Sequence, residues 1–191
     1  VIGSDCDPAD LMQVNSAATS VMLECLSETG RQPGVILAGS GFEYGDHSQP
    51  ISEGTIERPA SPYGRSKLAA TRVAEEFSDR LPILVLRIFG VYGPGENENL
   101  LIPFVIRRVV EGRPVDLSPG RQVRDFAYVE DVAKTFWAAS KWLVESNRDW
   151  NIVNVGSGRP LTIRALLKDL AILMDAKGFS ADLKWGVQGY R

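Results

Sequence analysis

Residue types that usually mark metal centres or disulfide frameworks are scarce in this sequence. It contains one histidine and two cysteines in 191 residues. Cys6 and Cys25 do not have the spacing of metal ligands, and His47 lies in a polar loop, so we expect no metal site. Unpaired cysteines of this kind are typical of a reducing compartment, which predicts a cytoplasmic protein.

The sequence has neither an excess of one charge nor a long apolar run. Lys and Arg total 21 against 24 acidic residues, which gives a net charge of −3 and no reason to expect a nucleic-acid partner. No apolar segment approaches the ~20 residues that a membrane-spanning helix needs, so we expect no membrane partner. Hydrophobic residues make up 44% of the chain, as in an ordinary globular domain with its own core.

Short apolar runs alternate with segments of helical periodicity. The run at 35–38, which is followed by Gly39, and the run at 81–90, which ends at Gly90, predict buried strands. A helix between them fits a βαβ unit with parallel strands. Apolar residues at helical spacing over 10–30 predict another helix, which Gly30 would end. Further helices are expected at 101–111, 131–144 and 162–177, and further strands at 114–117, 123–128, 151–156 and 181–185.

The segment from Val35 to Lys67 is the most informative part of the chain. Its strand ends at Gly39-Ser40-Gly41, and open α/β sheets place their ligands at the carboxyl ends of strands. Ser61-Pro62 then suits the N-cap and first position of a helix. On that helix Tyr63 and Lys67 are four residues apart, so they share one face.

Tyr63 and Lys67 are therefore a candidate acid/base pair. An ammonium favours a neighbouring phenolate, so we expect the pKa of Tyr63 to fall toward the working range. The hydroxyl of Ser40 could hold the same reacting oxygen. A Tyr-x-x-x-Lys pair alone favours the simpler interpretation, a solvated tyrosine and lysine on a surface helix. The order of buried strand, terminal serine and Ser-Pro-Tyr helix start favours a site.

Residues 35–45 and 61–67 resemble the active-site segments of the extended short-chain dehydrogenase/reductases, the nucleotide-sugar epimerase/dehydratase family. The matching residues are Ser40, Tyr44-Gly45, Tyr63 and Lys67. A second segment, 122–132, resembles the family signature Gln-x-Arg-Asp-Phe-x-Tyr-Val-x-Asp-Val. The likeness extends over nearly the whole chain.

The resemblance implies a role for each matching residue. Ser40, Tyr63 and Lys67 would be catalytic: Tyr63 moves a proton, Ser40 donates to the same sugar oxygen, and Lys67 binds the nicotinamide ribose. Phe89 would lie near the nicotinamide. The cofactor would be NAD or NADP, and the ligand a nucleotide sugar.

Two arginines and one asparagine have weaker assignments. Arg124 and Arg191 would bind the diphosphate of the nucleotide sugar; for Arg124 a surface salt bridge with Asp125 or Asp131 is the alternative. Asn15 would support the active site through backbone and water contacts, or it is a plain surface residue of its helix. The surrounding match favours phosphate binding for Arg124, and for Asn15 we leave the two alternatives open.

The implied fold is α/β, the C-terminal part of a Rossmann-like doubly wound parallel sheet plus a smaller α/β substrate-binding lobe. Residues 1–95 would be the remainder of an NAD(P)-binding domain with the active site, and 96–191 mainly the nucleotide-sugar-binding lobe, although 151–160 could return to the sheet. Helices 10–30 and 61–79 would pair with those of a second copy in a homodimer. Because the glycine-rich G-x-G-x-x-G turn is absent, we expect the sequence to be a piece of a longer protein.

The implied activity is that of a nucleotide-sugar 4-epimerase or 4-ketoreductase. A 4,6-dehydratase is disfavoured, because Gly41 and Phe42 stand where the family's dehydratases carry an Asp and a Glu. Glu43 is next to them, but in an extended segment it would point to the opposite face. The alternative is a catalytically silent binding or scaffold module. The missing glycine-rich turn favours it, and the retained Ser40, Tyr63 and Lys67 speak against it.

Overall fold

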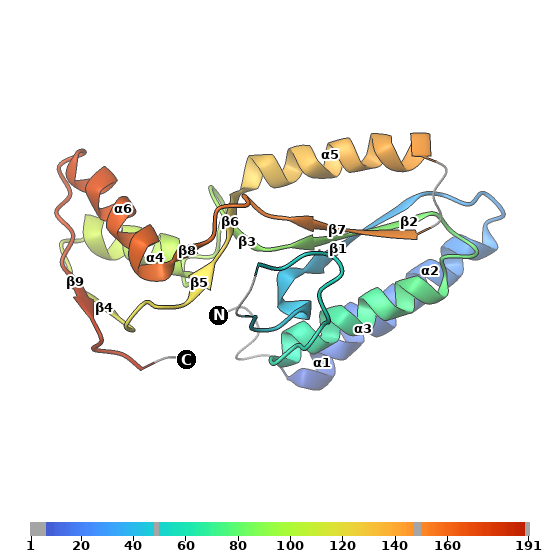
Figure 1. The fold of residues 1–191 in the computed structure, drawn as a ribbon, viewed down its shortest axis with the longest axis horizontal. Coiled ribbons are helices and arrows are strands. Elements are labelled where there is room, and N and C mark those ends of the chain that lie inside the picture. Colours follow the sequence, from blue (N-terminus) through green and yellow to red (C-terminus); the bar gives the residue numbers. More distant parts are fainter. Residues whose placement is uncertain (1–6, 48–49, 147–149, 190–191) are drawn as a thin grey trace. The chain divides into compact units, whose positions relative to one another are not determined.

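The computed structural model describes residues 7–47, 50–146 and 150–189. They form a mixed α/β fold that divides into two compact units (Figure 1). The first, here called the sheet unit, contains the described residues up to Val91 together with Ala127–Gly156. The second, the small unit, contains Tyr92–Phe126 and the described residues from Ser157 onward.

Three parallel strands form the centre of the sheet unit. Their order across the sheet is β1 (Val35–Ser40), β2 (Ile83–Ile88) and β7 (Trp150–Val155). The central strand β2 is almost entirely buried, as expected of a parallel strand covered on both faces. Helix α3 (Pro62–Glu76) lies between β1 and β2 in the chain, which confirms the predicted βαβ unit.

A continuous helical segment precedes β1. It consists of α1 (Pro8–Met12), the π-helical turn η1 (Gln13–Ala17) and α2 (Ala18–Glu28). The predicted helix over 10–30 is confirmed, but its π turn was not predicted. Such turns interrupt the regular hydrogen-bond ladder and often occur at functional sites.

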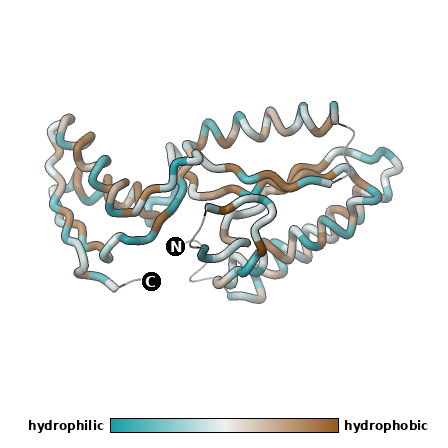
Figure 2. Tube along the Cα trace, viewed as in Figure 1, coloured by the Kyte–Doolittle hydropathy of each residue, from teal (hydrophilic) through white to brown (hydrophobic). Residues whose placement is uncertain are grey.

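Side chains of β2 alternate between two cores. Ile83 and Val85 pack with residues of α2 and α3, whereas Leu84 and Leu86 pack with residues of α5 (Val129–Ser146). Figure 1 shows α5 on one side of the strands and α2 with α3 on the other, and Figure 2 shows how hydrophobic the strands between them are. Burial on both faces explains why the apolar runs predicted these strands.

The small unit has a separate core of its own. It contains α4 (Leu101–Val110), α6 (Ile163–Asp175), the parallel pair β4 (Val115–Leu117) and β9 (Leu183–Trp185), and the antiparallel pair β5 (Val123–Arg124) and β8 (Leu161–Thr162). Its core cluster contains the buried residues Val105, Val109, Val115, Leu117, Leu167 and Met174. The predicted cap of the last helix is confirmed, since the Thr162 hydroxyl accepts the Ala165 N–H at 3.1 Å.

The predicted strand over 123–128 is wrong as a single element. The structure divides it at Asp125 into β5 and β6 (Phe126–Tyr128), and β6 pairs with β3 (Gly90–Tyr92). The Asp125 carboxylate accepts the backbone N–H groups of Ser157 and Gly158 at 2.7 and 2.8 Å. These partners are distant in sequence, so alternation alone could not reveal the break.

Composition also led to predictions about cysteines, metal sites and membrane-spanning helices. Cys25 is an unpaired thiol, as predicted, and the structure shows that it is exposed; Cys6 lies outside the described residues. Across 7–47, 50–146 and 150–189, no group of three or more His, Cys, Asp or Glu side chains could hold a metal ion. Among the helices of those same ranges, none has both the length and the apolar character to cross a membrane.

A buried ion pair joins β2 to the segment after β1. The side chains of Arg87 and Glu43 are both 0% exposed, and Arg87 Nε lies 2.8 Å from Glu43 Oε2. Arg87 Nη2 also binds Glu57 Oε1 at 2.7 Å. Burial alone lowers the pKa of Arg87, but hydrogen bonds with Tyr44 and Glu57 and the Glu43 charge raise it overall, so the guanidinium stays charged.

We predict that Arg87→Met destabilises the fold strongly. The change keeps an unbranched side chain but leaves the Glu43 carboxylate buried without a counter-charge. Removing one partner of a buried pair costs about 3–5 kcal/mol. Arg72→Met is the matched control, because Arg72 is half-exposed where it binds Glu57, and such surface pairs contribute about 0–1 kcal/mol. Urea unfolding curves check this, and equal losses in the two variants would contradict it.

Candidate active site

The carboxyl end of β1 carries Ser40, which is only 4% exposed. Ser40 is the N-cap of a 3₁₀ helix, η2 (Gly41–Glu43), and its hydroxyl accepts the Phe42 N–H at 3.2 Å. The Glu43 carboxylate in return accepts the Ser40 N–H at 2.7 Å. This reciprocal capping box fixes the backbone around the serine.

Helix α3 begins as the sequence predicts and packs against η2. Its N-cap Ser61 accepts the Gly64 N–H at 3.0 Å, and Pro62 occupies the first helical position. A Cβ atom at Gly64 would collide with the carbonyl oxygen of Phe42. The missing side chain therefore allows the first turn of α3, which carries Tyr63, to approach η2 closely.

The phenol of Tyr63 is half-buried beside Ser40 and Phe42. The rings of Tyr63 and Phe42 meet edge to face with their centroids 6.0 Å apart. Burial raises the pKa of Tyr63, a hydrogen bond with the Ser40 side chain opposes the rise, and the negative charge of Glu43 adds to it. Ser40 and Tyr63 thus present their hydroxyls together, as the resemblance implies.

The prediction that the pKa of Tyr63 falls is wrong for the protein without bound ligands. The net shift is upward, because loss of water disfavours the phenolate more than the Ser40 hydrogen bond favours it. The Lys67 charge is not among the interactions that shift this pKa. Spacing of four residues on a helix places two side chains on one face but does not bring their charged ends together.

Lys67 lies one turn beyond Tyr63 and is also half-buried. Burial lowers the pKa of its ammonium, and the Glu43 charge opposes that effect. Within the part of the chain that the structure describes, no hydrogen bond or ion pair occupies this ammonium, so its donors are available to a ligand. This arrangement suits a group that binds a polar ligand.

Phe89 lies directly after β2, beside the Ser40 turn. A Cβ atom at Gly41 would lie 2.9 Å from the Phe89 ring, so the ring packs on the Gly41 backbone. Phe89 also stacks on Tyr44, with the ring centroids 6.4 Å apart. The Tyr44 hydroxyl donates to Asn154 Oδ1 at 2.8 Å, which ties the turn to β7. The structure therefore places Phe89 against the turn that follows Ser40.

Asn15, in the π turn, contacts the active-site helix through its side chain. Its amide donates to Ser66 Oγ at 2.9 Å, and Ser66 Oγ donates to the Tyr63 carbonyl at 2.9 Å. Ser66 is fully buried. Asn15 is thus more than a surface residue, and it helps to fix the first turn of α3 through a contact that the sequence did not predict.

Glu43 is the site residue that sequence reasoning missed. The segment 41–43 was expected to be extended, but it is a 3₁₀ turn, and the carboxylate of Glu43 is completely buried. A local signal was available, because Ser40-x-x-Glu43 has the spacing of a capping box. The contact of Glu43 with Arg87, 44 residues away, has no such local signal.

The two arginines assigned to phosphate binding lie apart from this cluster in the chain. Arg124 belongs to the small unit, where its Nη1 donates to the Val123 carbonyl at 2.9 Å. Asp131, an alternative partner for Arg124, pairs with Lys134 at 3.0 Å. Arg191 lies outside the described residues. The phosphate-binding roles remain predictions.

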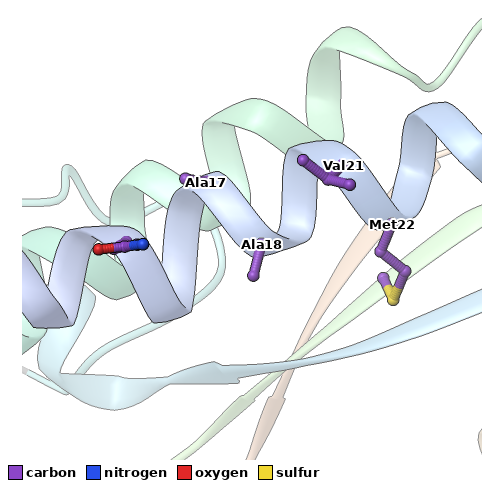
Figure 3. Close-up of a pocket in the computed structure, with 5 residues that line it drawn as sticks. Ala17, Ala18, Val21 and Met22 are labelled. Atoms are coloured by element: carbon purple, nitrogen blue, oxygen red, sulfur yellow. The ribbon is translucent and has the colours of Figure 1, made fainter.

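A shallow apolar hollow lies on the N-terminal helical segment. It has a volume of about 420 Å³ and is lined by Gln13, Ala17, Ala18, Val21 and Met22. Figure 3 shows the labelled side chains along this single helical segment. None of the candidate catalytic residues lines the hollow, so it is not the active site.

Comparison with known proteins identifies the family. The sequence profile of the NAD dependent epimerase/dehydratase family matches residues 3–156. The chain belongs to this family. Family membership confirms the resemblance that the motifs indicated.

Curated members of the epimerase/dehydratase family show moderate identity to the chain. UDP-glucuronate 4-epimerase from Thermodesulfobacterium geofontis is 30% identical over 168 residues, which cover 85% of this chain and 50% of the relative. GDP-6-deoxy-D-mannose reductase from Pseudomonas aeruginosa is 28% identical over 176 residues, covering 86% and 57%. The chain thus spans about half the length of the curated relatives it matches.

Solved structures of similar proteins agree with the fold. MoeE5 in complex with UDP-glucose and NAD has a TM-score of 0.77 and 33% identity over 90% of this chain and 57% of its own. RMD from Pseudomonas aeruginosa, complexed with NADPH, has a TM-score of 0.82 and 26% identity over 97% of this chain and 64% of its own. The predicted α/β class with a Rossmann-like parallel sheet is confirmed.

Proposed function

We propose that the complete gene product is an NAD- or NADP-dependent nucleotide-sugar 4-epimerase or 4-ketoreductase in which Tyr63 moves the proton. The observation that carries the proposal is the meeting of the Ser40 hydroxyl and the half-buried Tyr63 phenol at the carboxyl end of β1. Lys67, with available donors, lies on the same helix. Relatives named as a 4-epimerase and as a reductase support both alternatives.

In this proposal Tyr63 and Ser40 act on one oxygen of the sugar. Tyr63 takes the proton from the C4 hydroxyl, or returns it to the C4 ketone oxygen. Ser40 donates a hydrogen bond to that oxygen and stabilises its developing charge. The raised pKa of Tyr63 keeps the phenol protonated, which suits proton donation. For Tyr63 to act as a base, bound ligands must lower the pKa of its phenol again.

The residues at the sheet edge fit a nicotinamide cofactor. The free donors of Lys67 suit a ribose, and the Phe89 ring beside Gly41 offers an apolar wall. Bound NAD or NADP supplies the acceptor or the donor of a hydride at C4. Solved relatives contain NAD or NADPH, so the choice between the two stays open.

We assign the sheet unit to the remainder of an NAD(P)-binding domain and the small unit to nucleotide-sugar binding. In the small unit Arg124 would bind the diphosphate, with Arg191 as a second contact. The planar guanidinium can form two parallel hydrogen bonds to a phosphate, which a lysine cannot.

Tyr63→Phe removes the proton-transferring group and keeps the ring that packs on Phe42. We predict that kcat falls by roughly two to four orders of magnitude, the usual contribution of general acid/base catalysis. Affinity for the nucleotide sugar should hardly change. Steady-state kinetics of the complete gene product, with a panel of UDP- and GDP-sugars, measures both.

Two variants serve as controls for Tyr63→Phe. Tyr44→Phe removes a different buried phenol hydroxyl, the one bound to Asn154, and should change kcat by less than about tenfold, since a neutral hydrogen bond contributes about 1 kcal/mol. Arg124→Ala should raise KM more than it lowers kcat. Near-normal turnover by Tyr63→Phe would rule out the proposed mechanism.

The proposed enzyme does not catalyse 4,6-dehydration. That reaction needs a base for the C5 proton and an acid for the leaving C6 hydroxyl, and the two candidate positions hold Gly41 and Phe42. A side chain at Gly41 would meet the Phe89 ring, and Glu43 is held by Arg87. We predict no 4-keto-6-deoxy product from nucleotide-linked glucose in deuterated water. Mass spectrometry checks this, and such a product with deuterium at C5 would overturn it.

We also propose that the N-terminal helical segment packs against a second copy of the chain. Its apolar residues are unusually exposed: Met12 43%, Val14 69%, Val21 63% and Met22 41%. Val21 and Met22 line the same apolar hollow, and an exposed apolar patch is a candidate interaction site. Some of the apolar residues whose spacing predicted the helix therefore do not pack in the core of this chain, and they are available to pack against a second copy.

Val21→Glu should convert the dimer to a monomer, because a carboxylate would be buried in the proposed interface without a partner. Val144→Glu is the matched control, since Val144 is 82% exposed on α5. Light scattering coupled to size-exclusion chromatography gives the mass of each variant. A monomeric wild type, or equal effects of the two substitutions, would contradict the proposal.

A further inference from the structure

The buried carboxylate of Glu43 uses both of its oxygens. Oε1 accepts the Ser40 N–H at 2.7 Å. Oε2 accepts the Thr71 hydroxyl at 2.9 Å and Arg87 Nε at 2.8 Å. One side chain therefore connects the turn after β1, helix α3 and strand β2.

The contact with Thr71 fixes the helix along its own axis. Thr71 and Tyr63 are both on α3, eight positions apart, or roughly 12 Å along the axis at 1.5 Å per residue. A slide of α3 past η2 would break the hydrogen bond between Thr71 and Glu43. It would also move Tyr63 away from Ser40, which the same carboxylate holds through its backbone N–H.

The backbone around Glu43 is adapted to this arrangement. A Cβ atom at Gly39 would lie 2.9 Å from Glu43 Oε1 and 2.8 Å from Val85 Cγ1. Glycine at position 39 thus leaves room for the carboxylate beneath the strand end. Gly39 also lies opposite Arg87 in the register of β1 and β2, which brings the guanidinium to the same place.

We propose that Glu43 is the positioning residue of the active site, an inference that rests on the proposed function. Its carboxylate holds the Ser40 backbone at a fixed position along α3. The hydroxyls of Ser40 and Tyr63 therefore meet at one sugar oxygen. Glu43 itself touches no substrate in this account. It acts through Ser40 and through the helix that carries Tyr63.

The charge of Glu43 also acts on the acid/base residues. It raises the pKa of Tyr63 and that of Lys67. The groups that act on or contact the Tyr63 phenol are the Ser40 hydroxyl from β1 and Glu43 and the Phe42 ring from η2, whereas the Lys67 charge on its own helix does not shift the pKa of Tyr63. Arg87 binds the carboxylate from β2 and partly offsets its charge. Loss of the Glu43 charge should therefore make Tyr63 ionise at lower pH.

Glu43→Gln and Glu57→Gln form a matched pair of variants. Both remove a carboxylate from Arg87, but the hydrogen bonds of the Glu57 side chain are to Arg87 and Arg72, not to Ser40 or Thr71. In the complete gene product we expect Glu43→Gln to lower kcat by at least about tenfold with little change in KM, as for loss of hydrogen bonds to a charged group. Glu57→Gln should keep kcat within about threefold. Equal losses of kcat in the two variants would overturn the proposal.

Thr71→Val provides a milder test if Glu43→Gln does not fold. It removes one hydroxyl donor to Glu43 and keeps the volume and branching of the side chain. We expect a loss of kcat of roughly fivefold to tenfold, the effect of about one hydrogen bond, and recovery in Thr71→Ser, which retains the hydroxyl. Wild-type kcat in Thr71→Val would contradict the proposed register.

Titration of Tyr63 supplies a readout that needs neither cofactor nor turnover. Proteins labelled with ¹³C at the tyrosine ring are followed by NMR against pH, and Tyr63→Phe identifies the signal of Tyr63. We expect the signal to titrate at lower pH in Glu43→Gln and at the wild-type pH in Glu57→Gln. An unchanged titration in Glu43→Gln would overturn the inference. A wild type that turns over no nucleotide sugar would instead reject the proposed function, while the titration still decides whether Glu43 acts on Tyr63.

Discussion

The ion pair between Glu43 and Arg87 is the interaction on which the arrangement of the candidate active site depends. Two fully buried charges are costly to remove from water, so each must be satisfied by neighbours. Glu43 has the Ser40 N–H and the Thr71 hydroxyl, and Arg87 has Glu57, although the buried Nη1 of Arg87 has no hydrogen-bond partner among the described residues. The same bonds join β1, which ends at Ser40, β2, which Phe89 follows directly, and α3, which carries Tyr63.

Most elements of the fold could be predicted because their signals are local. The strands at 35–40 and 83–88 begin with apolar runs of four residues, 35–38 and 83–86, and helix α3 has a serine cap followed by proline. Such patterns need only neighbouring residues. They fixed which elements exist, and the parallel pairing of β1 and β2 followed from the helix between them.

The remaining features depend on partners that are distant in sequence. Asp125 interrupts the predicted strand because it caps a turn 32 residues away, at Ser157. The Glu43 side chain points into the core because it forms an ion pair there with Arg87 of the neighbouring strand β2. The pKa of Tyr63 rises because the fold buries the phenol, and the spacing between Tyr63 and Lys67 contains no information about burial.

The candidate site combines polar side chains with apolar neighbours. Phe89 packs on Gly41, and Phe42 packs against Tyr63, so the proposed mechanism has a single pair of hydroxyls, those of Ser40 and Tyr63, to act on the sugar oxygen. This composition favours chemistry at one carbon, with one proton to move. It matches epimerisation or ketone reduction at C4 better than an elimination, which needs a second acid/base pair.

The central claim, hydride transfer at C4 of a nucleotide sugar, is tested most directly by following deuterium at that carbon. The complete gene product is incubated either with a C4-deuterated nucleotide sugar and NAD, or with a 4-keto nucleotide sugar and nicotinamide cofactor deuterated at the transferring position. The account predicts product with deuterium at C4, in the epimer from the first mixture or in the alcohol from the second. Product formed with the C4 label lost to water, or conversion that leaves the C4–deuterium bond of the starting sugar intact, would contradict it.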